Sequence, residues 1–167
     1  SHPELRNRTF VTREQAQKVA AVARANGIRL IPELDCLGHQ SGRKSPLPLL
    51  RVYPEFAEPP DQFTDKDSAH MRSWCPNHPK VNRVVFALID ELVDAFDADA
   101  FHAGMDEVFQ LASENCPRCK GGDPAKLFAK SANDLHAHIV GKRKLEMLIW
   151  GDRLLDAKAI GSGKWEA

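Results

Sequence analysis

The stretch Ala98-Asp99-Ala100-Phe101-His102-Ala103-Gly104-Met105-Asp106-Glu107 decides the fold of this chain and indicates its chemistry. A short apolar segment, typical of a buried strand, ends here on two adjacent carboxylates. At the rim of a sheet, the surroundings can favour the proton-donating form of one acid and the charged form of the other. The pair therefore suggests acid catalysis. In many proteins an Asp-Glu pair only keeps the end of a strand in contact with water. The rest of the motif and its structural context therefore have to show whether this pair is catalytic.

Three helix–strand units follow one another along the chain, and the stretch above supplies the strand of the second unit. Apolar residues recur at helical spacing before each strand, most clearly over residues 81–96. Pro32 cannot donate a hydrogen bond to a central strand, so we expect the regular pairing of the first strand to end near Ile31. The predicted units are helix 12–26 with strand 28–35, helix 81–96 with strand 98–104, and helix 123–141 with strand 145–150.

The connection from each helix to the next strand is only a few residues long. Such short connections predict an α/β fold with parallel strands and helices packed outside. The loops that leave the strands are longer, and we interpret the proline-rich stretch 45–60 as a wall of a substrate cleft. Both barrels and open parallel sheets place their active site at the carboxyl ends of the strands. Acidic, histidine and aromatic residues gather at those ends: Glu33, Asp35, His39, Asp106, Glu107, Trp150 and Asp152.

The composition of the 167 residues is that of an ordinary globular domain, with 23 basic and 23 acidic side chains and 43% hydrophobic residues. This charge balance gives no reason to expect a nucleic-acid partner. The apolar runs are far shorter than the ~20 residues of a membrane span, so we expect no membrane segment. The chain starts at Ser1 with a polar stretch, so no signal peptide is visible and we expect the polypeptide to begin further upstream.

Two of the four cysteines form a Cys-Pro-Arg-Cys sequence, Cys116 to Cys119, while Cys36 and Cys75 stand alone. The pair is compatible with half a zinc site, a redox pair or a local disulfide. No second Cys-x-x-Cys and no His-x-x-x-His completes a set of zinc ligands. We therefore predict no metal site and interpret the pair as a disulfide that crosslinks the loop or as unreactive thiols. Because these two states are typical of different cellular compartments, the compartment stays open.

Two longer motifs resemble glycoside hydrolase family 20, the β-N-acetylhexosaminidases. The stretch Pro32-Glu33-Leu34-Asp35-Cys36-Leu37-Gly38-His39 is similar to the Pro-Glu-x-Asp-x-Pro-Gly-His motif of one strand end. His102-Ala103-Gly104-Met105-Asp106-Glu107 is similar to the His-x-Gly-x-Asp-Glu motif of the next strand. Cys75-Pro76-Asn77-His78-Pro79 and Ile149-Trp150-Gly151-Asp152 resemble two shorter family features. Leu37, where members usually have proline, suggests a divergent branch.

The resemblance implies a (β/α)8 TIM barrel, of which residues 1–167 hold about strands 3 to 5 as a partial catalytic domain. The remaining strands, with a sugar-binding arginine and further aromatic contacts, would lie elsewhere in the parent protein and form the natural partner of this piece. We expect the piece by itself to be inactive. The family also implies a secreted or periplasmic protein.

The chemistry that the resemblance implies is retaining hydrolysis of a terminal β-linked N-acetylhexosamine, with the substrate's own acetamido oxygen as nucleophile. Glu107 would be the general acid and then the base, and Asp106 would hold the acetamido N–H and stabilise the oxazolinium intermediate. No metal or cofactor is required. The supporting residues would be His39 and Asp35 beside the acid, Trp150 around the N-acetyl methyl group, and His102 and Glu33 behind them.

Two other functions stay open at this point. An inactive barrel that only binds glycans would keep Trp150, but it would have little reason to keep His39 with both carboxylates. A metal-dependent hydrolase would use His39, His102, Asp106 and Glu107 as ligands. Two residues also have purely structural interpretations, His102 as a satisfied core histidine and Trp150 as a buried barrel aromatic.

Overall fold

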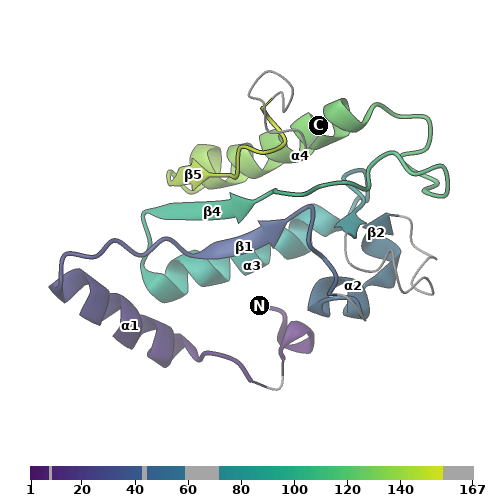
Figure 1. Cartoon of the computed structure of the whole chain (residues 1–167). Coiled ribbons are helices and arrows are strands. Elements are labelled where there is room, and N and C mark those ends of the chain that lie inside the picture. Colours follow the sequence, from purple (N-terminus) through teal and green to yellow (C-terminus); the bar gives the residue numbers. More distant parts are fainter. Residues whose placement is uncertain (8, 43–44, 59–71, 156–167) are drawn as a thin grey trace.

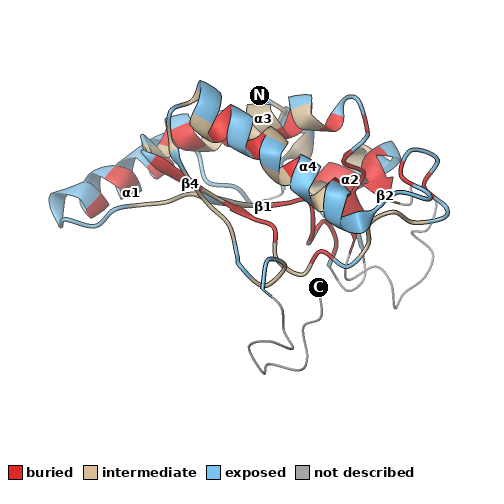
Figure 2. Ribbon diagram, turned by 90° about the horizontal axis from the view of Figure 1, so that it is seen from above, coloured by how far each residue is buried: buried red, intermediate tan, exposed pale blue. Residues whose placement is uncertain are grey.

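The computed structural model of the chain describes residues 1–7, 9–42, 45–58 and 72–155. Three parallel strands form one sheet in the order β1–β4–β5. Helices α3 and α4 lie on the same face of this sheet, and α1 packs beside α3 (Figure 1, Figure 2). The α/β fold with parallel strands is thus confirmed. The elements of this layer are α1 (Arg13–Ala25), β1 (Glu33–Cys36), α3 (Val81–Phe96), β4 (Ala100–Gly104), α4 (Pro124–His136) and β5 (Glu146–Leu148).

Local sequence signals fix both ends of α1. The Thr12 side chain accepts a hydrogen bond from the Gln15 backbone N–H, and the Gln15 side chain accepts one from the Thr12 N–H, which completes the predicted capping box. At the other end Gly27 adopts φ +68°, and the Ile28 N–H donates to the Ala23 carbonyl at 2.9 Å. This is the Schellman arrangement that glycine favours. The first predicted helix is confirmed.

The prediction that regular pairing of the first strand ends near Ile31 is wrong. Strand β1 begins at Glu33, which pairs with His102 of β4. Pro32 lies at the start of the strand, where only its carbonyl is used, and this carbonyl accepts the His102 N–H at 3.0 Å. A proline at the first position of a strand removes no ladder bond, so it marks the beginning of β1 and not its end.

Helix α3 is the main cover of the sheet and begins and ends as its apolar stripe predicts. Its inner face is buried against β4, where Phe101 and Ala103 are inaccessible to solvent. The buried stripe of α3 and the central strand give the red inner layer of Figure 2. The helix stops at Asp97, whose φ of 50° places it in the left-handed region. The buried residues of α3 are Val81, Val84, Val85, Ile89, Val93 and Ala95.

The third unit also follows its sequence signals. The Asp123 carboxylate accepts the Ala125 N–H at 2.9 Å, and Pro124 occupies the first helical position of α4. A π-helical segment, η4 (Ala137–Lys142), continues the helix and ends one residue beyond the predicted stop at Gly141. Strand β5 then pairs with β4, Ala100 opposite Glu146.

The long connection from β1 to α3 folds back onto the main core. Leu50 and Phe56 are buried in the same cluster as the sheet and α3, so the described part of this connection packs on the main core. The predicted cleft wall includes Pro59 and Pro60, which lie outside the described residues. None of the described helices is both long and apolar enough to span a bilayer. The small elements are η1 (Pro3–Leu5), α2 (Pro48–Val52), η2 (Pro54–Phe56) and the antiparallel pair β2 (Ala57–Glu58) and β3 (Ser73–Trp74).

Candidate active site

The loops that leave β1, β4 and β5 meet at one edge of the sheet. The Trp150 N–H, after β5, donates to the carbonyl of Gly104 at the end of β4, at 2.9 Å. Gly38, after β1, lies so close to β4 that an added Cβ would be 3.0 Å from the Asp106 carbonyl oxygen. Because parallel strands end together, three segments that are distant in sequence come into contact here.

His39 contacts both carboxylates of the Asp-Glu pair. Its Nε2 atom lies 3.2 Å from Asp106 Oδ2 and 3.4 Å from Glu107 Oε2. All three side chains are partly buried, with 27–30% of each exposed. The other oxygen of Asp106, Oδ1, is buried and has no hydrogen-bond partner among the described residues. One histidine therefore holds the two acids side by side, and one oxygen of Asp106 is buried without a donor among the described residues.

The backbone around these side chains adopts left-handed conformations that side-chain-bearing residues usually avoid. On the β4 side Met105 has φ 69° and Glu107 φ 46°, and on the β1 side Leu37 has φ 67° and His39 φ 54°. Each such residue costs on the order of 1–3 kcal/mol, and such residues cluster at sites where a side chain has to be aimed. The strain is thus concentrated on the two segments that carry the His39–carboxylate cluster.

Two further residues hold the strained segments in place: Gln40, which the sequence did not single out, and Asp152, which it placed at the strand ends. The Gln40 amide donates to the carbonyls of Asp35 and Gly38, at 2.7 and 2.6 Å, and so closes the turn that carries His39. Asp152 accepts the Glu107 N–H through Oδ2 at 3.0 Å. The place of Asp152 was visible in the sequence, because it follows the strand that carries Trp150. No sequence feature predicted the role of Gln40.

His102, Glu33 and Trp150 form a second group beside the first. Glu33 Oε1 lies 3.1 Å from His102 Nδ1 and accepts the Trp150 Nε1–H at 3.3 Å. The His102 and Trp150 rings are 4.9 Å apart. Trp150 is 51% exposed in this chain. His102 pairs with Glu33 and not with the two acids, so the four ligands suggested for a metal-dependent hydrolase do not converge.

Asp35 lies next to the cluster without being bonded to it. No hydrogen bond joins its carboxylate to His39 in the described part of the chain, so the structure shows no direct orienting contact. Burial raises the pKa of Asp35, the nearby His39 opposes this shift, and the charge of Asp106 adds to it. The charged form of Asp35 is thus disfavoured at this position.

A cavity of about 250 Å³ opens directly above the two acids. Its walls are Asp106 and Glu107 from the β4 exit and Trp150, Gly151 and Asp152 from the β5 exit. An exposed aromatic ring beside paired carboxylates gives the cavity one apolar side and one acidic side. This combination suits a sugar ring, which has apolar faces and a polar rim.

One known protein family matches nearly the whole chain. Residues 2–164 match the family model described as glycosyl hydrolase family 20, catalytic domain. The chain belongs to glycosyl hydrolase family 20. The resemblance seen in the two strand-end motifs is thereby confirmed for nearly the whole chain. The catalytic domains of family 20 are TIM barrels, and the parallel sheet with its outer helices fits that architecture.

The relatives of this chain include two bacterial β-hexosaminidases. A β-hexosaminidase from Akkermansia muciniphila is 30% identical over 112 residues, which cover 65% of this chain and 22% of that protein. One from Vibrio furnissii is 25% identical over 154 residues, 87% of this chain and 23% of that protein. The crystal structure of a Flavobacterium johnsoniae chitobiase has a TM-score of 0.68 at 21% identity, over 87% of this chain and 22% of its own, and shows the shared fold. The chain thus spans less than a quarter of each of these proteins.

Proposed function

We propose that the protein containing this chain is a glycosidase that removes terminal β-linked N-acetylhexosamine residues from glycans or glycoconjugates. The reaction would retain the anomeric configuration, with the substrate's own acetamido group as nucleophile. The observation that carries the proposal is the His39–carboxylate cluster in a family 20 chain: two adjacent acids share one histidine at the exit of β4. The exposed Trp150 ring on the same cavity supports it.

Glu107 is the general acid in this mechanism. Its carboxylic acid protonates the glycosidic oxygen as the bond to the leaving group breaks, and the resulting carboxylate then takes a proton from the attacking water. Two observations support this role. The left-handed backbone of Glu107 and its N–H bond to Asp152 fix where the residue sits, and the side chain lines the cavity.

Asp106 acts on the acetamido group. Its Oδ2 atom is engaged by His39, the residue lines the cavity, and in this mechanism its carboxylate accepts the acetamido N–H. That hydrogen bond turns the acetamido oxygen toward the anomeric carbon. As this oxygen attacks, the nitrogen gains positive charge, and the Asp106 carboxylate stabilises the oxazolinium ion.

The remaining site residues support these two acids. His39 positions both carboxylates, and Trp150 encloses the N-acetyl methyl group. Glu33 and His102 hold the Trp150 ring by the contacts described above, and Asp35 lies close enough to His39 to interact with its charge. Residues 1–167 form about strands 3 to 5 of the barrel, and the other strands supply the contacts to the sugar hydroxyls.

The test is hydrolysis of a chromogenic N-acetyl-β-glucosaminide and of the matching β-glucoside by the full-length parent protein. We expect cleavage of the N-acetyl substrate only. The Asp106→Asn variant should lose most of this activity, because the neutral amide does not stabilise the oxazolinium charge. Equal cleavage of both substrates would exclude the acetamido mechanism, and cleavage of neither, with binding retained, would favour the glycan-binding alternative.

A further inference from the structure

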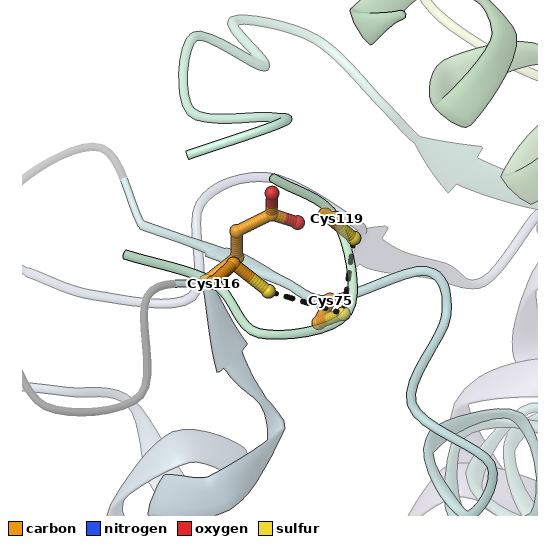
Figure 3. A group of neighbouring side chains, drawn as sticks. Cys75, Cys116 and Cys119 are labelled. Atoms are coloured by element: carbon orange, nitrogen blue, oxygen red, sulfur yellow. Dashed lines mark hydrogen bonds between the residues drawn. The ribbon is translucent and has the colours of Figure 1, made fainter. Parts of the chain in front are cut away.

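Three of the four cysteines converge at a point away from the carboxylate cluster. Cys75 follows β3, while Cys116 and Cys119 belong to the loop between β4 and α4. Cys75 Sγ lies 3.2 Å from Cys119 Sγ and 3.6 Å from Cys116 Sγ (Figure 3). All three thiols are buried and none is in a disulfide in this structure. The tertiary structure thus adds to the Cys-Pro-Arg-Cys pair the third thiol that the sequence spacing did not reveal.

A fourth donor, Glu58 of β2, completes the group. Its side chain is fully buried, and one ligand atom from each of the four residues lies within 4.8 Å of the others. Glu58 Oε1 accepts the Ser113 N–H at 3.1 Å, whereas Oε2 has no hydrogen-bond partner among the described residues. A buried carboxylate with an unpaired oxygen is costly unless a cation or a donor satisfies it.

The geometry and the chemistry of the four donors fit one metal ion. With a Zn–S bond of about 2.3 Å, two sulfur ligands of a tetrahedral zinc lie roughly 3.8 Å apart, close to the spacings seen here. Three thiolates and one carboxylate carry the same formal charge as the four thiolates of an all-cysteine zinc site. A disulfide between Cys75 and Cys119 would use only two of these groups and would leave Cys116 and the Glu58 oxygen unsatisfied.

We propose that Glu58, Cys75, Cys116 and Cys119 bind one structural zinc ion. All four ligands are protein groups, so the site is closed and has no open position for catalysis. The ion would connect two long loops, the one between β1 and α3 and the one between β4 and α4. The second of these loops begins with Asp106 and Glu107, so the zinc would anchor a wall of the cavity without touching the substrate. This differs from the expectation of no metal that the cysteine spacing alone suggested.

Metal analysis of the full-length parent protein tests this directly. The protein is purified without chelators and with a thiol reductant, and its zinc content is measured by inductively coupled plasma mass spectrometry. We expect one zinc per chain that is absent from the Cys119→Ala variant. Cys36→Ala is the matched control, because Cys36 is equally buried but lies outside the cluster. It should keep the full zinc content.

A second variant keeps the test decisive if Cys119→Ala fails to fold. Glu58→Gln preserves the side-chain volume and the acceptor for the Ser113 N–H, and we expect it to fold and to release zinc to a chelator faster than the wild type. Substitution by Co²⁺ should give thiolate-to-metal charge-transfer absorption in the wild type. Reduced thiols that take up no added zinc, or a Cys75–Cys119 disulfide found by mass spectrometry of the native protein, would overturn the proposal.

Discussion

Glu107 has a left-handed backbone although it carries a long side chain, and Met105 shares this conformation two residues earlier. A free chain would avoid both, so the surrounding contacts have to enforce them. The enforcing contacts are the hydrogen bond from the Glu107 N–H to Asp152 and the close approach of Gly38 to the Asp106 carbonyl. At the scale of single residues, tertiary contacts therefore hold Glu107 in an unfavourable backbone conformation, and this conformation places its side chain at the cavity.

Replacing Glu107 by glutamine should lower kcat for the N-acetyl substrate by at least about 10²-fold, the usual contribution of a general acid. The amide has the same shape but donates no proton, so the melting temperature should stay near that of the wild type. Steady-state kinetics and circular dichroism melting check the two parts. Glu114→Gln, an exposed carboxylate on the same loop, is the control and should keep full activity. Full activity in Glu107→Gln would remove the residue from the mechanism.

Asp35→Asn should stabilise the protein at neutral pH. Burial raises the pKa of Asp35, so the folded state holds its proton more tightly than the unfolded state does. Stability is therefore lost as the pH rises from the usual aspartate pKa through the raised one, and the neutral asparagine avoids this loss. Melting temperatures over a pH series should show a gain at neutral pH that shrinks in acid. A gain that does not change with pH would refute the burial argument.

At the scale of the elements, Gly104 is the last residue of β4, and both its positive φ and the close approach of β1 require glycine there. It has φ +63°, and an added Cβ would lie 3.0 Å from Asp35 Cα. Gly27 has a similar φ of +68° but no atom within 4 Å of the added Cβ. Gly27→Ala should therefore cost about 1–2 kcal/mol for the backbone alone. Gly104→Ala should cost about 1–3 kcal/mol more, from the contact with β1.

Urea unfolding of the full-length protein measures both glycine variants, and activity assays complete the comparison. We expect Gly104→Ala to lose activity as well, because a shift of β1 against β4 moves His39 relative to Asp106. Gly27 lies directly after α1, before β1 begins, so Gly27→Ala should keep normal turnover in the remaining folded protein. Equal free energies of unfolding for the two variants would contradict the predicted contact with Asp35.

Helix α3 is the element whose packing stabilises the sheet most directly. Ile89, in the middle of its buried face, is inaccessible to solvent. Ile89→Val should cost about 0.5–1.5 kcal/mol and Ile89→Ala about 2–5 kcal/mol, since each step removes buried methyl groups and leaves a larger cavity. Chemical denaturation of the two variants measures whether the loss in free energy of unfolding increases from Ile89→Val to Ile89→Ala. Similar costs for both would mean that the site collapses around the shorter side chains.

The elements were predictable to the extent that their signals are local. The capping box at Thr12, the stop at Gly27 and the stripe of α3 lie within one turn or one face of a helix, and all three were confirmed. The extent of β1 was not predictable. It depends on which carbonyl and N–H groups β4 presents to it, so the role of Pro32 became clear only from its bond to His102.

At the scale of the whole molecule, the chain leaves large apolar side chains in water. Val19 and Val22 of α1 are 52% and 65% exposed, and Ile28 is 58% exposed. The chain also spans less than a quarter of the two β-hexosaminidases named above, and its sheet ends in two edge strands, β1 and β5. Open edges and apolar patches of this kind promote association, which supports the proposal that the chain forms part of a larger barrel.

Residues 1–167 expressed alone should therefore show no hydrolysis of the N-acetyl substrate and should associate in solution. The full-length parent should be active under the same conditions. Size-exclusion chromatography with light scattering and the chromogenic assay compare the two. A monomeric, active product from residues 1–167 would show that these residues contain all of the catalytic contacts, which would contradict the partial-barrel proposal.

The sequence by itself determined the order of helices and strands, the parallel α/β fold and the family, because each rests on signals within a few neighbouring residues. Through the family resemblance it also predicted Asp106 and Glu107 as the catalytic acids and His39 beside Glu107. Only the tertiary structure decided that His102 pairs with Glu33 and away from the acids, that Gln40 holds the His39 turn, and that Glu58 and Cys75 join the Cys116–Cys119 pair. The physical reason is that contacts between distant segments depend on how the strands are placed side by side, and local residue patterns carry no record of that placement.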